Sequence, residues 1–443
     1  MNKKKRNQHI IEEKIYRRRR KKKIIRTRKD NITKFVSVFH SYVRFLDDYL
    51  KFFFSSQFIS REYCVEVSII ESPKYFSFKK GYNDTIIFIR QYLSTYFFGK
   101  KHIILDFSKC EVSSIAAFTL LHIVIHQTEL FKNKYNNSYQ YSQCLKKVKF
   151  RFSAKDIKTN KFISAIFGID LPSEFPNLKN SLYLPLDLIF GRKRLCENNM
   201  KGSASTKVTK FVNEALRKIG FELNKYGEKH IGNLIGEVLA NCEDHCYNNS
   251  NWYIDGLAFA EGEGETEIVQ LNISIVNVGK SMYEAFEETK EFNKDIYSRV
   301  SDKYKKHQEK FTSILKFEKE SLYTLYLLND GISRLKYKDS SRGNGTTRFL
   351  NSFITLGGIG NENKKYNSLL NIISGHTVIT CDNEFKPIAR EELMIIPLNR
   401  NNNPTELPDK KYLNYHEEYF PGTILECSIY INRQNMTRKF EKE

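Results

Sequence analysis

The chain has 443 residues, of which 40 % are hydrophobic, and a formal net charge of +21. This length suits two or three domains with sizeable cores, and the composition excludes a wholly disordered chain. The best candidate for a membrane span, residues 85–98, is interrupted by Arg90 and Gln91, so the sequence predicts a soluble protein.

Most of the basic charge lies at the start of the chain. Residues 1–30 hold 15 Lys or Arg against three acidic residues and so carry +12 of the net charge. We predict that 1–34 is a disordered or helical tail, which either solubilises the protein or contacts nucleic acid. The tail lacks the apolar stretch of a secretory signal, and the eight Cys form no Cys-x-x-Cys pair. Both observations favour a cytoplasmic protein with reduced thiols.

Residues 35–195 alternate between strand and helix patterns. Apolar residues at helical spacing predict a first helix at 35–54. Further strands are expected at 63–70, 102–107, 147–152 and 181–186, and helices at 83–98, 114–132 and 159–167. Strands separated by helices of this length predict a small α/β domain over 35–195, with its helices packed on a sheet.

One junction in this domain is more informative, HIILDFSKCEVSSIAAFTLLHIVIHQ at 102–127. A buried strand ends at Asp106, and Ser113 or Ser114 precedes an apolar helical run, where serine is a common N-cap residue. The stretch resembles the STAS domain of anti-anti-sigma factors, in which such a strand leads through Asp-Ser-Ser-Gly into a helix. Ser113 stands where that family has the Asp. The resemblance implies a phosphorylation switch at Ser114, and an ordinary helix cap is the alternative.

The second half of the chain begins after a polar stretch of small residues at 196–205, which predicts a linker. Helices are then expected at 206–219 and 228–247. Strands are expected at 252–260 and 267–277, on either side of the turn EGEGE.

The helix at 228–247 carries a row of polar side chains. Glu237, Asn241 and His245 are spaced i, i+4 and i+8, so they project from one side of the helix and border its apolar stripe. A carboxylate, an amide and an imidazole in this position indicate a shared cavity. A surface helix with a chance spacing of polar residues is the alternative.

Three further features follow this helix along the chain, each at the end of a strand or the start of a helix. They are Asn277-Val278-Gly279 at the end of a buried strand, SRGNGTT at 341–347 before a helix, and Pro421-Gly422-Thr423 at the entry of the strand 424–431.

The four features in this order resemble the GHKL superfamily, the ATP-binding fold of gyrase, chaperone, histidine kinase, anti-sigma kinase and mismatch-repair ATPases. The resemblance implies a GHKL, or Bergerat, α/β sandwich over 206–436, with a mixed sheet covered by helices on one face. It is closest in style to the anti-sigma-factor serine kinases. It implies ATP and Mg²⁺ as ligands, with Asn241 as the magnesium ligand, Glu237 as the catalytic base and His245 close to the nucleotide.

The same resemblance assigns the walls of the nucleotide site. The family uses an Asp to accept a hydrogen bond from the amino group of adenine, and Asn277 stands at that position with an amide oxygen that also accepts. Gly279 would pass beneath the adenine, because it lacks a Cβ. Gly422 and Thr423 would pass behind the base. The phosphate lid, whose backbone N–H groups would face the triphosphate, is expected at Arg342, Gly343, Asn344, Gly345 and Thr346.

An insert is expected at 283–340, with helices at 283–316 and 319–329. It is interpreted as an elaborated lid or a partner-docking arm, with a plain surface helix hairpin as the alternative. A further strand is expected at 373–380, and 399–411 is a polar segment with two Pro residues, typical of a surface loop.

The sequence therefore predicts a bacterial switch protein that couples the nucleotide state of a GHKL domain to a STAS-like domain, to a protein partner or to a second copy. Three function classes stay open. The protein is an enzyme that hydrolyses ATP or phosphorylates serine with Glu237 as base, a sensor that binds ATP and Mg²⁺ without turnover, or a nucleic-acid-associated protein that uses residues 1–30.

Overall fold

The computed structural model describes most of the chain from residue 69 onward. The described residues are 69–98, 102–135, 148–171, 183–192, 200–245, 251–262, 267–312, 315–329, 368–382, 388–390 and 393–433. The predicted basic tail and the helix expected at 35–54 lie outside them. Within this part of the chain, no helix has the length and apolar character needed to cross a membrane.

Residues 69–171 form an N-terminal unit of short parallel strands and three helices. Its strands are β1 (Ile69–Glu71), β2 (Tyr75–Phe76), β3 (Ile103–Asp106), β4 (Val112–Ser113) and β5 (Val148–Arg151). Its helices are α2 (Tyr82–Phe98), α3 (Ile115–Tyr135) and α5 (Ile157–Phe167). Strands β1, β3 and β5 pair in parallel in that order, and β2 pairs in parallel with β4. The strands expected at 102–107 and 147–152 and the helices expected at 83–98, 114–132 and 159–167 are present within a few residues of their predicted positions, whereas most of the strand expected at 63–70 lies outside the described residues.

Helix ends in this unit follow from local chemistry. Ser114 Oγ accepts a hydrogen bond from the Ala117 N–H at 3.4 Å, at the start of α3. Asp156 caps α5 by accepting from the Lys158 N–H, and Gly168 ends that helix in the left-handed conformation with φ +63°. Each cap satisfies backbone groups that the helix itself leaves without partners.

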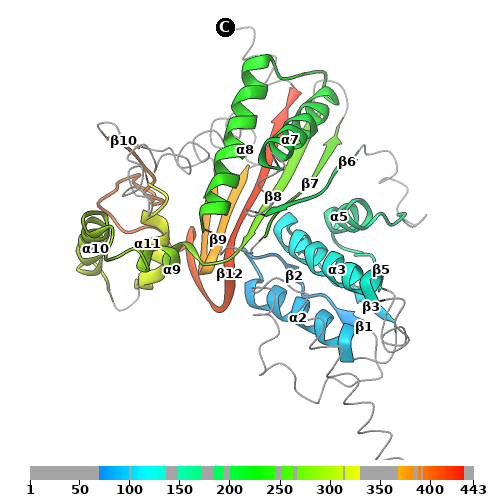
Figure 1. The fold of residues 1–443 in the computed structure, drawn as a ribbon, viewed down its shortest axis with the longest axis horizontal. Coiled ribbons are helices and arrows are strands. Elements are labelled where there is room, and N and C mark those ends of the chain that lie inside the picture. Colours follow the sequence, from blue (N-terminus) through cyan, green and yellow to red (C-terminus); the bar gives the residue numbers. More distant parts are fainter. Residues whose placement is uncertain are drawn as a thin grey trace, which may run out of the picture.

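A five-stranded central sheet organises the rest of the molecule (Figure 1). Its strands, in spatial order, are β6 (Tyr183–Arg192), β7 (Asn251–Glu261), β8 (Ile268–Val278), β12 (Leu413–Asn432) and β9 (Leu369–Asp382). Every pair of neighbours in this order is antiparallel. Strands β10 (Ile388–Arg390) and β11 (Leu393–Ile395) form a separate two-stranded ribbon.

Helices cover both faces of the central sheet. Helices α7 (Met200–Arg217) and α8 (Lys225–His245) pack on one face, and α2, α3 and α5 of the N-terminal unit lie on the other (Figure 1). On β8, Leu271 and Ile275 face the helix pair, whereas Val276 and Val278 join the core of the N-terminal unit. The central sheet differs from the expected one, a mixed sheet with helices on one face, in two ways. Its neighbouring strands are all antiparallel. Its second face is apolar, and the N-terminal unit buries it.

Two boundaries expected from the sequence are corrected. The strand predicted at 181–186 was assigned to the N-terminal domain, but β6 pairs with β7 at the edge of the central sheet, from Tyr183 opposite Phe259 onward. Strand patterning indicates that a segment is extended and does not identify its partner. Residues 200–205 of the predicted linker belong to α7, where Ala204 and Ser205 are buried. The burial of these two residues extends the packed side of α7 into the predicted linker.

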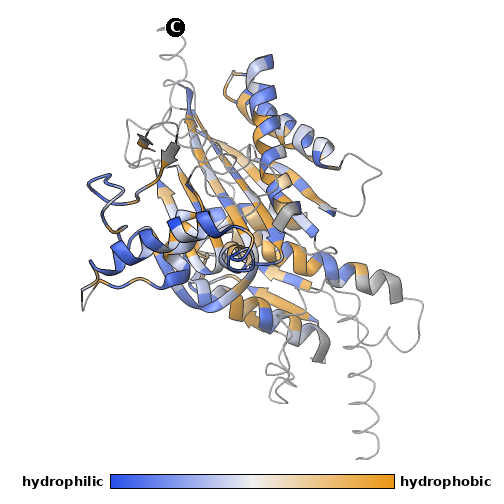
Figure 2. Ribbon diagram, turned by 60° about the vertical axis from the view of Figure 1, so that its left-hand side comes forward, coloured by the Kyte–Doolittle hydropathy of each residue, from blue (hydrophilic) through white to orange (hydrophobic). Residues whose placement is uncertain are grey.

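Three helices form an arm at one end of the central sheet, α9 (Met282–Glu287), α10 (Lys294–Gln308) and α11 (Lys319–Tyr326). The arm lies beside β9 and β12 in Figure 1, and its helices are largely hydrophilic in Figure 2, in contrast to the strands of the sheet. The single helix expected at 283–316 is two helices, because the chain leaves helical geometry at Asn293, the N-cap residue of α10. Residues 399–411 contain no helix or strand, as the polar composition predicted.

Candidate functional site

Two residues of the predicted polar row, Glu237 and Asn241, lie on α8 with described side chains. Helix α8 runs without a break from Lys225 to His245, so Glu237 and Asn241 project from one side, one turn apart. Both side chains are half-buried, between the buried Val238 and the exposed side of the helix. His245 is the last residue of α8, and its side chain lies outside the described part of the chain.

The last turn of α8 contacts the end of β8. Asn277 is 3 % exposed, and its Nδ2 donates a hydrogen bond to the carbonyl oxygen of Cys242 at 3.2 Å. Asn277 is also the register partner of Thr423 on β12. The predicted polar helix, the end of β8 and the Gly422–Thr423 pair are thus neighbours in space, although they are far apart in the sequence.

Gly422 is held against the backbone of Asn277. Its φ is +128°, and a Cβ at this position would overlap the carbonyl oxygen of Asn277. The Gly279 N–H donates to the Pro421 carbonyl oxygen at 3.1 Å, which closes the same end of the strand pair. Glycine is therefore required at 422 by the conformation of the chain and by the closeness of β8.

A hydroxyl from β9 ties this end of the sheet to the arm. Ser374 Oγ donates to the Gly422 carbonyl oxygen at 3.0 Å and lies 2.9 Å from Thr423 Oγ1. The same oxygen accepts from the N–H of Met282, the first residue of α9, at 2.9 Å. Ser281 and Glu284 form a capping box that begins α9 directly after the Gly279 turn. The loop that follows β8 is consequently fixed at both of its ends.

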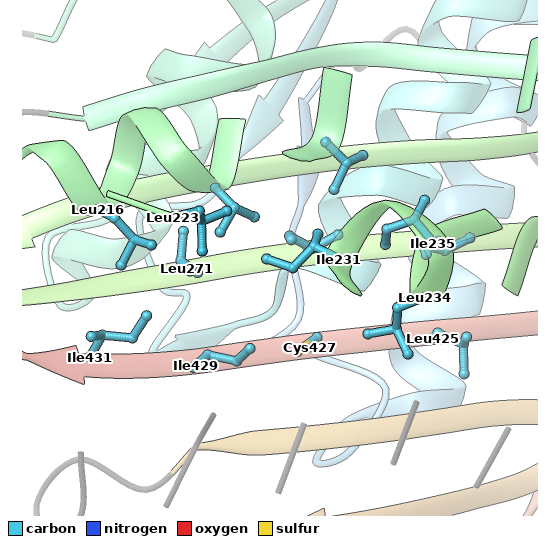
Figure 3. A pocket seen from close by; sticks show the side chains of 14 residues that line it. Leu216, Leu223, Ile231, Leu234, Ile235, Leu271, Leu425, Cys427, Ile429 and Ile431 are labelled. Atoms are coloured by element: carbon cyan, nitrogen blue, oxygen red, sulfur yellow. The ribbon is translucent and has the colours of Figure 1, made fainter. Parts of the chain in front are cut away.

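Asn241 lies on the same side of α8 as Leu234. Leu234 lies seven residues, or nearly two helical turns, before Asn241, so the two side chains leave α8 on the same side. Leu234 lies beside Leu425 of β12 in a cavity between the helix pair and the sheet (Figure 3). Asn241 directly precedes Cys242, whose carbonyl oxygen accepts from Asn277, so the backbone of Asn241 lies near the end of the sheet where Asn277 pairs with Thr423.

The cavity itself does not suit a polar ligand. Its volume is about 80 Å³, and all its lining residues are Val, Leu or Ile except Cys427. None of the predicted site residues lines it. Burial raises the pKa of the Cys427 thiol well above its usual value, so this thiol is neutral and belongs to the apolar lining. A nucleotide would have to lie beyond this cavity, over the polar end of the sheet.

Titratable side chains lie between the arm and this end of the sheet. The Glu320 carboxylate of α11 accepts from the His376 N–H at 2.8 Å, and burial raises the pKa of Glu320 above its ordinary value. Tyr419 of β12 donates to Glu284 of α9. Burial lowers the pKa of His416, which favours its neutral ring.

The remaining predicted site residues are either outside the described part of the chain or have a structural role. Arg342, Gly343, Asn344, Gly345 and Thr346, the predicted phosphate lid, lie outside the described residues. Among the residues that are described, no group of three or more His, Cys, Asp or Glu side chains is arranged to hold a metal ion. Magnesium would depend on the Asn241 amide, on water and on the nucleotide. Ser114 is 8 % exposed and caps α3, as the alternative interpretation expected, and its phosphorylation stays a prediction.

Sequence reasoning missed Ser374 and Gly375, which it assigned only to a strand. Gly375 has φ +61° and lies opposite Phe420, where β12 carries extra residues relative to β9. The signal was available, because a glycine inside an apolar strand indicates a bulge or a close backbone approach. The sequence pattern does not identify which group approaches Gly375.

Comparison with protein-family models, with curated proteins and with solved structures found no match to this chain. The chemistry is therefore inferred from the residues that the fold brings together. These are Asn277, Thr423 and Gly422 at the paired ends of β8 and β12, with the last turn of α8 hydrogen-bonded to Asn277 through the carbonyl oxygen of Cys242. Amide and hydroxyl groups of this kind can donate and accept hydrogen bonds.

Proposed function

We propose that the protein is an ATP- and Mg²⁺-binding switch, with a GHKL-type nucleotide site at the end of the central sheet. One observation carries this proposal, the convergence of three features that are separate in the sequence. Asn277 bonds to the backbone of α8 at Cys242, and Gly422 lies against Asn277. The resemblance to the GHKL superfamily requires these three features to be side by side, and a chance set of glycine and asparagine motifs would not be.

Each residue has a role that its chemistry supports. The Asn241 amide oxygen would complete the coordination of a magnesium ion that is otherwise bound by phosphates and water. The Asn277 amide oxygen would accept from the amino group of adenine, and Thr423 would add a hydroxyl behind the base. His245 would lie near the phosphates, because it is one turn beyond Asn241 at the end of α8.

A titration tests the proposal directly. We expect ATP to bind in the presence of Mg²⁺, and the Asn241→Ala variant to bind at least about tenfold more weakly, the loss expected for a ligand to a charged group. Asn233→Ala is the matched control, because Asn233 is an exposed residue of the same helix. Calorimetry with and without Mg²⁺ measures both. A wild-type protein that binds no adenine nucleotide would contradict the proposal.

A change at Glu237 tests whether the protein is an enzyme or a sensor. As an enzyme, the protein would use Glu237 to take a proton from water or from a serine hydroxyl, and such bases contribute about 10²- to 10⁴-fold to a rate. Glu237→Gln should then bind ATP normally and lose turnover, whereas Glu214→Gln, at an exposed position of α7, should keep it. Absence of turnover in the wild type with intact ATP binding would assign the sensor role.

The N-terminal unit would be the STAS-like partner of this site. Its parallel strands β1, β3 and β5, its helices and the position of Ser114 at the start of α3 support that comparison. Because the unit packs on the central sheet itself, a change at the nucleotide end has a direct route to it. Switching between units would thus occur within one chain, with a protein partner or a second copy as the receiver.

A further inference from the structure

Three parts of the molecule meet on a short segment of β9, Ser374–Thr377, which we call the joint. Gly375 is its centre. The Tyr82 hydroxyl of α2, in the N-terminal unit, donates to the Gly375 carbonyl oxygen at 2.9 Å. From the arm, the Glu320 carboxylate accepts from the next N–H, that of His376, and would overlap a Cβ placed on Gly375. The N-terminal unit and the arm therefore bind the two ends of one peptide group, the carbonyl oxygen of Gly375 and the N–H of His376.

The joint is continuous with the proposed nucleotide site. Ser374, the residue before Gly375, bridges Gly422 and Thr423 of β12 and the first N–H of α9 through one hydroxyl. A shift of the Gly375 peptide moves this hydroxyl, because the two residues are covalently adjacent. The three hydrogen bonds at Ser374 then change together, and with them the position of the Gly422–Thr423 pair.

A bulge of β12 extends the joint toward α2. Between the pairs Tyr415–Thr377 and Phe420–Gly375, residues 416–419 of β12 lie opposite the single residue His376 of β9. The His416 ring stacks on Tyr82 with centroids 4.6 Å apart and the ring planes 4° from parallel. The Glu418 carboxylate lies 2.6 Å from the guanidinium of Arg90 on α2.

The other end of the bulge contacts the arm. Tyr419 donates to Glu284 of α9, the residue that completes the capping box after the Gly279 turn. Ser321 of α11 lies 3.2 Å from Thr377 through their hydroxyl groups, at the far end of the joint. The N-terminal unit and the arm are thus linked through the joint and its bulge, because both form hydrogen bonds to them.

We infer that the joint is a coupling element, through which the N-terminal unit and the arm jointly set the geometry of the nucleotide end of the sheet. Tyr82 and Glu320 are positioning residues in this arrangement. The inference deepens the proposed function and rests on it for the nucleotide half, but the coupling between α2 and the arm does not depend on the identity of the ligand. By linkage, a nucleotide that favours one position of the joint also favours the matching position of the arm.

The test compares two conservative changes on the same helix. Tyr82→Phe removes the bond to Gly375 and keeps the ring that stacks on His416. Tyr92→Phe is the matched control, because Tyr92 is also buried in α2 and its hydroxyl lies 3.0 Å from Thr128 of α3, away from the joint. Amide hydrogen exchange is followed in α11 and in residues 368–382, and ATP affinity is measured with Mg²⁺.

We expect Tyr82→Phe to speed exchange in α11 about fivefold, the change that follows from loss of one neutral hydrogen bond, and to weaken ATP binding. Tyr92→Phe should change neither. Exchange in α11 that is equal in the two variants would overturn the coupling. If the wild type binds no ATP but Tyr82→Phe still speeds exchange in α11, the coupling stands and the nucleotide proposal fails.

A second pair of variants approaches the joint from the arm. Glu320→Ala removes the acceptor of the His376 N–H, whereas Glu318→Ala changes an exposed residue at the start of the same helix that makes no side-chain cap. Glu320→Ala should speed exchange in 374–377 and in α2 near Tyr82, and Glu320→Gln should restore protection because an amide oxygen also accepts. Equal effects of the alanine changes at 318 and 320 would contradict the assignment of Glu320.

Discussion

Gly422 is the residue whose identity the structure fixes most tightly. It combines a positive φ with a backbone neighbour, Asn277, that cannot move aside without disturbing β8. The sequence had predicted a close approach at this glycine and assigned it to an adenine base. The structure adds a second cause inside the chain itself, so Gly422 is required whether or not a ligand is present.

Replacing Gly422 with Ala separates steric overlap from backbone strain. We expect Gly422→Ala to lower the free energy of unfolding by about 3 kcal/mol, because the new methyl group would overlap the Asn277 carbonyl oxygen in addition to straining φ. Gly168 is the matched control, with φ +63° and open space around it, so Gly168→Ala should cost only about 1 kcal/mol. Denaturant unfolding measures both, and equal losses would exclude the overlap.

At the scale of elements, the sequence predicted what periodicity and end signals encode. Helices α7 and α8 follow from apolar spacing, and β7 and β8 from strand-forming segments on either side of a glycine turn. Strand β12 was predicted only from 424, although it begins at Leu413, because the polar bulge residues at 416–418 interrupt its alternation. Pairing is a tertiary property, which explains why the place of β6 and the role of Gly375 were not predictable from one sequence.

Some residues of the candidate site were likewise predictable from the sequence, and others were not. Asn241, Asn277 and Gly422 were predicted as site residues because helix spacing and strand ends mark them. The fold places Gly422 against Asn277 and bonds Asn277 to the backbone of Cys242, the residue after Asn241. Ser374 carried no such mark. Its importance comes from a hydroxyl that meets β12 and α9 at once, and both contacts join residues distant in the sequence.

The arm has its own dependence on pH, through His307 of α10. Its Nδ1 lies 2.7 Å from the Tyr326 hydroxyl of α11, and burial, with the nearby positive charges of Lys303 and Lys310, lowers the pKa of His307 to about 4. The folded arm therefore favours the neutral ring. Stability from this packing is complete above about pH 6.5, the ordinary value for histidine, and is lost as the pH falls toward the folded value.

Acidification should consequently loosen α10 from α11. Between pH 7.5 and pH 4.5 we expect the arm to lose up to about 3 kcal/mol of local stability, read as faster amide exchange in both helices. His307→Phe should remove most of this pH dependence, since the ring no longer takes up a proton. His230→Phe, at an exposed position on α8, should leave it unchanged. An unaltered profile in His307→Phe would assign the loosening to other groups.

At the scale of the whole molecule, the N-terminal unit and the central sheet share one interior. The face of the sheet opposite α7 and α8 contributes Val276, Phe420 and Ile424 to the core of the N-terminal unit. Polar contacts also join the central sheet to the N-terminal unit. Asp255 of β7 lies 2.8 Å from the His122 ring on α3, and the Glu426 carboxylate of β12 accepts from the Ala116 N–H at the start of that helix. An acidic group is favoured there by the helix dipole.

This shared interior leads us to expect that the two halves do not fold apart. A chain of residues 200–443 lacks β6 and leaves the apolar second face of the sheet uncovered, together with the buried carboxylates of Asp255 and Glu426. Exposed apolar surface of that extent favours aggregation, and an uncompensated sheet face lowers stability. We expect this fragment to bind a hydrophobic dye, to self-associate in size-exclusion chromatography and to lack a cooperative unfolding transition.

Two controls distinguish a shared core from simple damage by truncation. A chain of residues 69–443 keeps every described element and should unfold cooperatively. Co-expression of 1–199 with 200–443 should restore a soluble complex, because the same interface forms between fragments. If 200–443 alone is monomeric and unfolds cooperatively at the temperature of the intact chain, the N-terminal unit is dispensable for the sheet. Its packing would then be that of a separable domain, and the coupling through Tyr82 would have to act across a dissociable interface.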